Sequence, residues 1–133
     1  MAADDSTRYE VIMEAASDWP ADLGARLALA SRAARTAVPA APGRETAIRD
    51  VAAGVAAPAL VMFASWLLAE SRRRGLEQLR FLSRDGQVLH ELARRLATAS
   101  GGGPDLEYVY SSRITWSLAA TDPRDLAEAP AHL

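Results

Sequence analysis

Chemically versatile residues stand together after a short apolar run at residues 79–82, namely Ser83, Arg84, Asp85 and Gly86. If this run is a strand, the four residues lie at its carboxyl end, where open α/β sheets bind their ligands. A carboxylate beside the exposed N–H groups of a following helix can bind Mg²⁺ or handle a proton on a phosphorylated ligand. Asp85 is therefore a candidate acid/base or metal ligand, and Arg84 a source of positive charge.

A second polar cluster, Ser111, Ser112 and Arg113, follows the apolar and aromatic run at residues 106–110. If the two runs are neighbouring parallel strands, both clusters emerge at the same edge of the sheet. The serine hydroxyls then suit a phosphate group, and the guanidinium of Arg113 suits a phosphate or a carboxylate. A purely structural interpretation also stands, in which the carboxylate of Asp85 caps the next helix and the serines are helix caps beside a surface arginine.

The elements that must position these clusters are a strand, a helix and a second strand. Residues 79–82 and 106–110 have strand composition, and residues 86–99 have the apolar period of an amphipathic helix. His90 falls on the outward face in this pattern, and the inward face carries Val88, Leu89, Leu92 and Leu96. A strand–helix–strand unit predicts a parallel pair joined by a right-handed crossover.

The amino-terminal half of the chain has mainly helical patterns. A helix is predicted over residues 18–36, a breaker-rich linker over 38–43, and a second helix from about residue 44 towards 54. Residues 1–17 are mixed in character and are expected to be partly frayed. A short helix is expected after Arg113, before a polar tail.

The longest uncharged run, residues 51–69, approaches the roughly 20 residues that span a bilayer. Its many alanines, together with Gly54 and Pro58, argue against such a span. A further helix is predicted from Pro58 on, because one apolar stripe there is typical of a helix packed on a sheet, namely Leu60, Phe63, Ala64, Leu67 and Leu68. Arginines at 72–74 close that helix, and Gly75 is a suitable C′ residue. The arginines are interpreted as a solvated helix end, with a patch for phosphate or lipid headgroups as the alternative.

Composition excludes several classes of function. All 15 basic residues are arginine, so a Schiff-base or P-loop lysine is missing, and without cysteine there is no thiol nucleophile or thiolate metal site. The net charge of −2 does not call for nucleic acid. No signal-peptide pattern opens the chain, which makes a cytoplasmic protein the default. The tryptophans at 19, 66 and 116 are predicted to pack in the core.

The segments APALVMFASWLLAE, FLSRDGQVL and LEYVYSSRITW, between residues 57 and 116, resemble a known family. They are similar to haloacid-dehalogenase-like proteins found among bacterial polysaccharide and glycosyltransferase gene products. In that family the first strand ends in Asp-x-Asp, where the first aspartate attacks phosphorus, the second is a general acid/base, and Mg²⁺ lies between them and the phosphate.

The resemblance implies roles for particular residues. Asp85 matches the second aspartate and Gly86 the residue after it, whereas Ser83 stands at the position of the nucleophile. Ser111 or Ser112 matches the hydroxyl residue that binds phosphate. The later lysine or arginine and the acidic metal-binding motif of the family have no clear counterpart before the last residue, so the chain is expected to be a truncated domain. This expectation and the serine at the nucleophile position both argue against ordinary phosphatase activity.

We therefore predict an α/β protein, a Rossmann-like, haloacid-dehalogenase-like three-layer fragment with an amino-terminal helical region. Residues 1–43 would form the helical segment and linker, 44–121 the partial core, and 122–133 the tail. The expected function is hydrolysis or binding of a phosphorylated small molecule, with Mg²⁺ as cofactor. The alternatives are a non-catalytic module that meets a partner protein or the rest of its domain and, less favoured, a membrane-anchored protein that uses residues 51–69.

Overall fold

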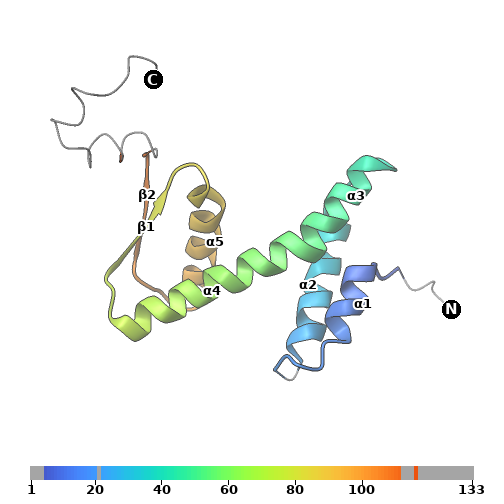
Figure 1. Cartoon of the computed structure of the whole chain (residues 1–133), viewed down its shortest axis with the longest axis horizontal. Helices are drawn as coiled ribbons and strands as arrows, with labels where there is room; N and C mark the ends of the chain where they lie inside the picture. The colour runs from blue at the N-terminus through green and yellow to red at the C-terminus, as the bar shows by residue number, and fades with distance from the viewer. Residues whose placement is uncertain (1–4, 21, 112–115, 117–133) are drawn as a thin grey trace, which may run out of the picture. The chain divides into compact units, whose positions relative to one another are not determined.

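A computed structural model of the chain describes residues 5–20, 22–111 and 116 (Figure 1). The elements in chain order are α1 (Arg8–Glu14), α2 (Leu23–Ala37), α3 (Arg44–Val51), the π-helical turn η1 (Ala52–Ala56), α4 (Ala57–Arg74), β1 (Gln78–Leu82), α5 (Gly86–Ala99) and β2 (Asp105–Val109). The fold is helix-rich α/β with a small parallel sheet. The chain divides into two units, Met1–Phe63 (unit 1) and Ala64–Leu133 (unit 2), and the division falls inside α4.

Helix α1 lies in the amino-terminal segment that was expected to be partly frayed. Its start is a capping box, in which the Thr7 hydroxyl accepts from the Glu10 N–H at 3.3 Å and the Glu10 carboxylate accepts from the Thr7 N–H at 2.9 Å. The Thr-x-x-Glu spacing was the available signal. A helix of seven residues is too short to show a convincing apolar period.

Helix α2 begins at Leu23 rather than at residue 18, because the residues before it form a turn. Asp22 has a φ of 65°, and the Leu23 N–H donates to the carbonyl of Pro20 at 3.1 Å. The buried face of α2 consists of Gly24, Ala28, Ser31 and Arg35. α1 packs against α2 within unit 1, as Figure 1 shows.

A single uninterrupted helix, Arg44–Arg74, replaces the two helices predicted around Gly54 and Pro58. Proline lacks an N–H and its ring crowds the carbonyl four residues earlier, which normally breaks a helix. Here η1 precedes the proline, and the Ala57 N–H bonds to the carbonyl of Ala52, five residues back. This wider turn accommodates Pro58. Gly54 allows close packing instead of a break, because a Cβ there would lie 2.7 Å from the Cβ of Tyr9.

The same helix is long and apolar enough to cross a membrane when judged by length and composition alone. Its most apolar 18-residue window has a mean hydropathy of 2.0, and 22% of that window is buried. A core helix of a soluble protein can pass the same test, but such a helix is mostly buried.

In unit 2 the observed elements agree closely with those predicted. The helix ends at Arg74, with Gly75 at a φ of 65°, and the Leu76 N–H donates to the carbonyl of Ser71 at 2.9 Å, which completes a Schellman motif. α5 has the predicted bounds. β1 and β2 pair in parallel, with Leu82 opposite Val109. The predicted strand–helix–strand unit is therefore confirmed.

The two faces of the sheet differ in chemistry. On one face, Phe81 is buried with Leu68, Ala93 and Ala97, and Leu79, Leu89, Leu96, Leu106 and Tyr108 pack around them. The other face carries polar cross-strand pairs, with Gln78 bonded to Asp105 at 3.1 Å and Arg80 paired with Glu107 at 2.9 Å. Parallel sheets in three-layer folds are usually apolar on both faces. In the part of the chain that the structure describes, the α/β class holds and a third layer is not seen.

The rotation of α5 differs from the prediction. Gly86, His90, Ala93 and Ala97 face the sheet, while Val88 is exposed. The ring of His90 lies between those of Phe81 and Tyr108, at centroid distances of 5.5 and 5.9 Å. The prediction of an outward His90 is thus wrong, because small residues on α5 bring it close to the sheet.

The tryptophans at 19, 66 and 116 are exposed, which corrects their predicted place in the core. The buried positions are held mostly by small residues, among them Ala28, Ala53, Ala64, Ala93 and Ala97. Such side chains let backbones approach too closely to admit an indole ring. The buried core of the described residues therefore consists mostly of alanine side chains and contains few aromatic ones.

Candidate functional site

The carboxyl ends of β1 and β2 meet, as the sequence predicted, and Ser83 joins them. Its N–H donates to the carbonyl of Val109 at 2.9 Å. Its hydroxyl donates to the carbonyl of Ser111 at 2.5 Å and accepts from the Ser111 N–H at 2.8 Å. The hydroxyl at the expected nucleophile position is therefore held in two hydrogen bonds to backbone. Its attack on a ligand would require the loss of this contact between the strands.

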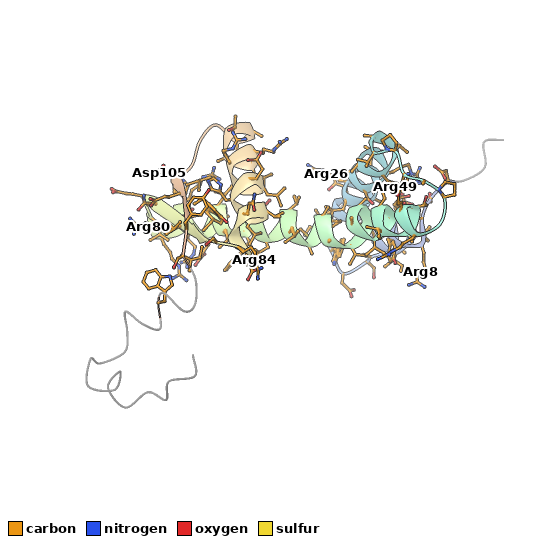
Figure 2. The ribbon with its side chains drawn as sticks, turned by 90° about the horizontal axis from the view of Figure 1, so that it is seen from above. Arg8, Arg26, Arg49, Arg80, Arg84 and Asp105 are labelled. Atoms are coloured by element: carbon orange, nitrogen blue, oxygen red, sulfur yellow. The ribbon has the colours of Figure 1, made fainter. Side chains whose placement is uncertain are left out.

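Arg84 and Asp85 follow Ser83 in the turn before α5, and both are exposed. Figure 2 shows the Arg84 side chain on the outside of the ribbon. Asp85 stands at the N-cap of α5, but its carboxylate makes no capping hydrogen bond. Side-chain capping requires extended backbone, whereas Asp85 has helical angles of −67° and −28°. The capping interpretation of Asp85 is thus wrong, and the carboxylate is left available at the strand end.

Gly86 sets the distance between α5 and β1. A Cβ at this position would lie 3.0 Å from the carbonyl carbon of Phe81 and 3.1 Å from its Cβ. Contacts this short with backbone require a shift of the helix or the strand. The role of Gly86 visible in the structure is therefore close packing of the helix start on the strand, which fixes where the turn lies.

The second cluster is described only in part. Ser111 lies at the edge through its bonds to Ser83, whereas Ser112 and Arg113 lie outside the described residues, as do the predicted short helix apart from residue 116 and the tail at 122–133. Sequence reasoning missed Tyr110, which is 88% exposed and packs edge-on against Tyr108 at 5.1 Å. The alternation of tyrosines in this strand was the signal that could have identified it.

Arg84 differs from the other arginines in the described part of unit 2. Each of the others has an acceptor: Arg73 and Arg74 pair with Glu70, Arg80 with Glu107, Arg94 and Arg95 with Glu91, and Arg72 donates to Gly102 and Ser100. Within these described residues, no side-chain partner is found for Arg84 or Asp85. A guanidinium without a partner at a strand end has its donors available for an anion.

The paired arginines also change the acidity of their partners. Hydrogen bonds from Arg94 and Arg95 lower the pKa of Glu91 to about 2. Those from Arg73 and Arg74 lower the pKa of Glu70 in the same way, to about 2. Glu70 therefore offsets one of the three positive charges at 72–74, and all three guanidinium groups have acceptors within unit 2, which agrees with the interpretation as a solvated helix end.

The fit of Mg²⁺ to this edge depends on its carboxylates. In the described residues no three His, Cys, Asp or Glu side chains gather into a group that could hold a metal ion. Mg²⁺ prefers six oxygen ligands, usually one or two carboxylates with water and phosphate oxygens. Asp85 on its own does not supply such a site.

Comparison with known protein families, with curated proteins and with solved structures finds no match to this chain.

Proposed function

We propose that unit 2 is a haloacid-dehalogenase-like, Rossmann-like domain that binds a phosphorylated small molecule at the joined ends of β1 and β2, and that it does not hydrolyse this ligand by itself. The observation that supports the proposal is Arg84, an exposed guanidinium with no partner in the described residues, beside the bonded pair Ser83 and Ser111. Asp85 adds an oxygen acceptor for a ligand hydroxyl. Ser112 and Arg113 follow Ser111 directly in sequence and are the proposed further contacts.

Binding is favoured over catalysis by the state of Ser83. A phosphoryl-transfer nucleophile needs a free lone pair and a group that activates it. The Ser83 hydroxyl donates a hydrogen bond to the backbone carbonyl of Ser111. The residue at this position is a serine and not the aspartate that serves as nucleophile in the family it resembles. Mg²⁺ remains a prediction of the family resemblance, and the phosphate complex proposed here does not depend on it.

The first test is binding of inorganic phosphate to the full chain. We expect phosphate to raise the melting temperature and to shift the amide signals of residues 83–86 in NMR spectra. Loss of a charge-assisted hydrogen bond worth about 1.5–3 kcal/mol predicts that Arg84→Ala weakens this binding at least about tenfold. The measurement is repeated with Mg²⁺, and with Asp85→Asn, to separate a metal-assisted contribution.

Arg95→Ala is the matched control, because it removes another exposed arginine of unit 2 that is already paired with Glu91. It is expected to bind phosphate like the parent chain. Equal loss in both variants would mean that phosphate responds only to net charge. Absence of binding with and without Mg²⁺ would end the proposal and favour a module that meets a protein.

The protein-interaction alternative is supported by the sheet itself. Within the described residues the sheet consists of β1 and β2. Each of these strands therefore has one edge that no other described strand covers. Such edges readily pair with another strand. The rest of the domain, or a partner protein, is the proposed source of that strand.

The membrane alternative is favoured by the low burial of the apolar helix window. Against it, Ala53 and Gly54 are packed in unit 1, and Leu68 belongs to the core of unit 2. A span would remove these contacts. We therefore expect the chain to stay in the vesicle-free fraction in a flotation experiment with vesicles of phosphatidylcholine and phosphatidylglycerol. Co-flotation that survives high salt would replace the proposed function with that of a membrane anchor.

A further inference from the structure

Two adjoining apolar cavities lie in unit 1, along the seam between α2 and the helix that begins at Arg44. Their volumes are about 450 and about 210 Å³. Ala34, Ala53 and Ala57 line both, which makes the two cavities neighbours along one seam. Small-molecule sites are typically apolar clefts of about 300–1,000 Å³ with a few polar groups. The larger cavity falls in this range, and the smaller one adjoins it.

The cavities exist because the walls are built from small side chains on a widened helix. Alanines of α2 face the turn η1, where bonding between residues five apart expands the helix. π-Helical turns of this kind often occur at functional sites. At the outer end, Glu45 and Arg49 are already engaged: Glu45 accepts from the Ala41 N–H at 3.0 Å, and Arg49 pairs with Asp50 at 2.9 Å.

Ser31 is the polar residue in the wall of the smaller cavity, and its hydroxyl is an anomaly. The residue is 4% exposed, and the hydroxyl has no hydrogen-bond partner in the described part of the chain. By contrast, two other helical hydroxyls of this protein donate to a carbonyl one turn back: Thr36 donates to Arg32 at 2.8 Å and Ser71 to Leu68 at 2.9 Å. A buried polar group without a partner is destabilising. The oxygen is buried in the side-chain position that the structure shows, so a ligand in the cavity reaches it only after rotation about the Cα–Cβ bond of Ser31. The position of Ser31 in the cavity wall therefore points to a partner from outside the chain.

We propose that this seam binds a neutral, mainly apolar small molecule with a hydrogen-bonding oxygen, of the class of alkyl alcohols, and that Ser31 recognises the oxygen. The lining accounts for the apolar body of the ligand. A carboxylate in such surroundings would be left without a counter-charge, at high cost, because Arg49 is already paired. The apolar lining of the two cavities and the single hydroxyl of Ser31 thus define the class of ligand.

The probe is n-octanol, added to the full chain and followed by NMR chemical shifts of α2 and η1. Ser31→Ala is expected to weaken octanol binding by about threefold to tenfold, since a net hydrogen bond is lost. In the absence of octanol, the same variant is expected to melt about 4 °C or more above the parent chain, because an unsatisfied buried hydroxyl is gone. The opposite signs of these two effects are the signature of a recognition residue.

Ala34→Leu and Ala33→Leu form the second, matched test. Both positions are exposed on α2, and leucine is a good helix former, so both variants should fold. Ala34 lines both cavities, whereas Ala33 lines neither. We expect Ala34→Leu to abolish octanol binding and Ala33→Leu to preserve it.

Three results would overturn the proposal. The first is that octanol does not shift the NMR signals of α2 and η1 in the parent chain. The second is that Ser31→Ala binds octanol as tightly as the parent chain does, and the third is that Ser31→Ala has a lower melting temperature than the parent chain. The last result would mean that the hydroxyl is satisfied without a ligand.

Discussion

Replacing Arg35 with alanine is expected to lower the free energy of unfolding of unit 1 by about 3–5 kcal/mol, because it removes the main charged partner of a buried carboxylate. Glu10 is 0% exposed and Arg35 is 5% exposed. The Arg35 Nε donates to the Glu10 carboxylate at 3.1 Å, and its Nη2 donates to the carbonyl of Asp5 at 2.6 Å. Arg32 lies farther from the carboxylate, at 3.6 Å, and is a weaker substitute.

The loss can be measured by urea denaturation, together with hydrogen exchange at the amides of α1 and α2. Arg26→Ala is the control, because Arg26 is an exposed arginine of the same helix, labelled in Figure 2. Its removal should change stability by less than about 0.5 kcal/mol. Glu10→Gln keeps the volume and removes the charge, so it should also be destabilising. Equal effects of Arg35→Ala and Arg26→Ala would contradict a role for the buried pair.

This pair also gives a pH dependence. Burial raises the pKa of Glu10, but the hydrogen bonds from Arg35 and from the Thr7 backbone, with the charges of Arg35 and Arg32, hold it below its ordinary value of 4.5. A carboxyl with a lowered folded-state pKa stabilises the fold above its ordinary pKa and loses that contribution as the pH falls through the folded-state value. Arg35→Ala removes two of the causes that lower the pKa of Glu10, so the stability difference between this variant and the parent chain should shrink as the pH falls below 4.5.

Gly24→Ala is expected to destabilise unit 1 by about 3 kcal/mol, although the same change usually stabilises a helix. A Cβ at Gly24 would overlap the carbonyl oxygen of Met13 and lie 3.2 Å from the Met13 carbonyl carbon. That oxygen accepts from the Ala16 N–H at 3.3 Å, so the backbone of α1 is not free to turn away. Overpacking against backbone costs about 1–3 kcal/mol or more.

The sign of the effect makes this test sharp. In an exposed helix, alanine is more favourable than glycine by about 1 kcal/mol. Ala25→Gly, at the neighbouring exposed position, measures that propensity and should cost about 1 kcal/mol. Thermal and urea unfolding of both variants give the comparison. A stabilised Gly24→Ala would mean that α1 and α2 do not approach as closely as the structure has them.

Local sequence patterns predicted much of the secondary structure of unit 2. The bounds of α5, the parallel pairing of β1 with β2 and the left-handed glycine at Gly75 follow from breakers, strand composition and a helical period. The same patterns failed for His90 and Val88. An amphipathic period identifies an apolar side, but small residues at Ala93 and Ala97 shift the buried side toward the position where helix and sheet can approach most closely.

The order strand–helix–strand, and therefore the position of Ser83 and Ser111 at one edge, was determined by the sequence alone, because residue period and turn residues act over short distances along the chain. The hydrogen bonds of Ser83 to Ser111 and the buried, partnerless hydroxyl of Ser31 were decided only by tertiary structure. These states depend on which backbones come together from distant parts of the chain. Which backbones come together is decided by the packing of small side chains against a neighbouring helix or strand, and this packing leaves no local pattern in the sequence.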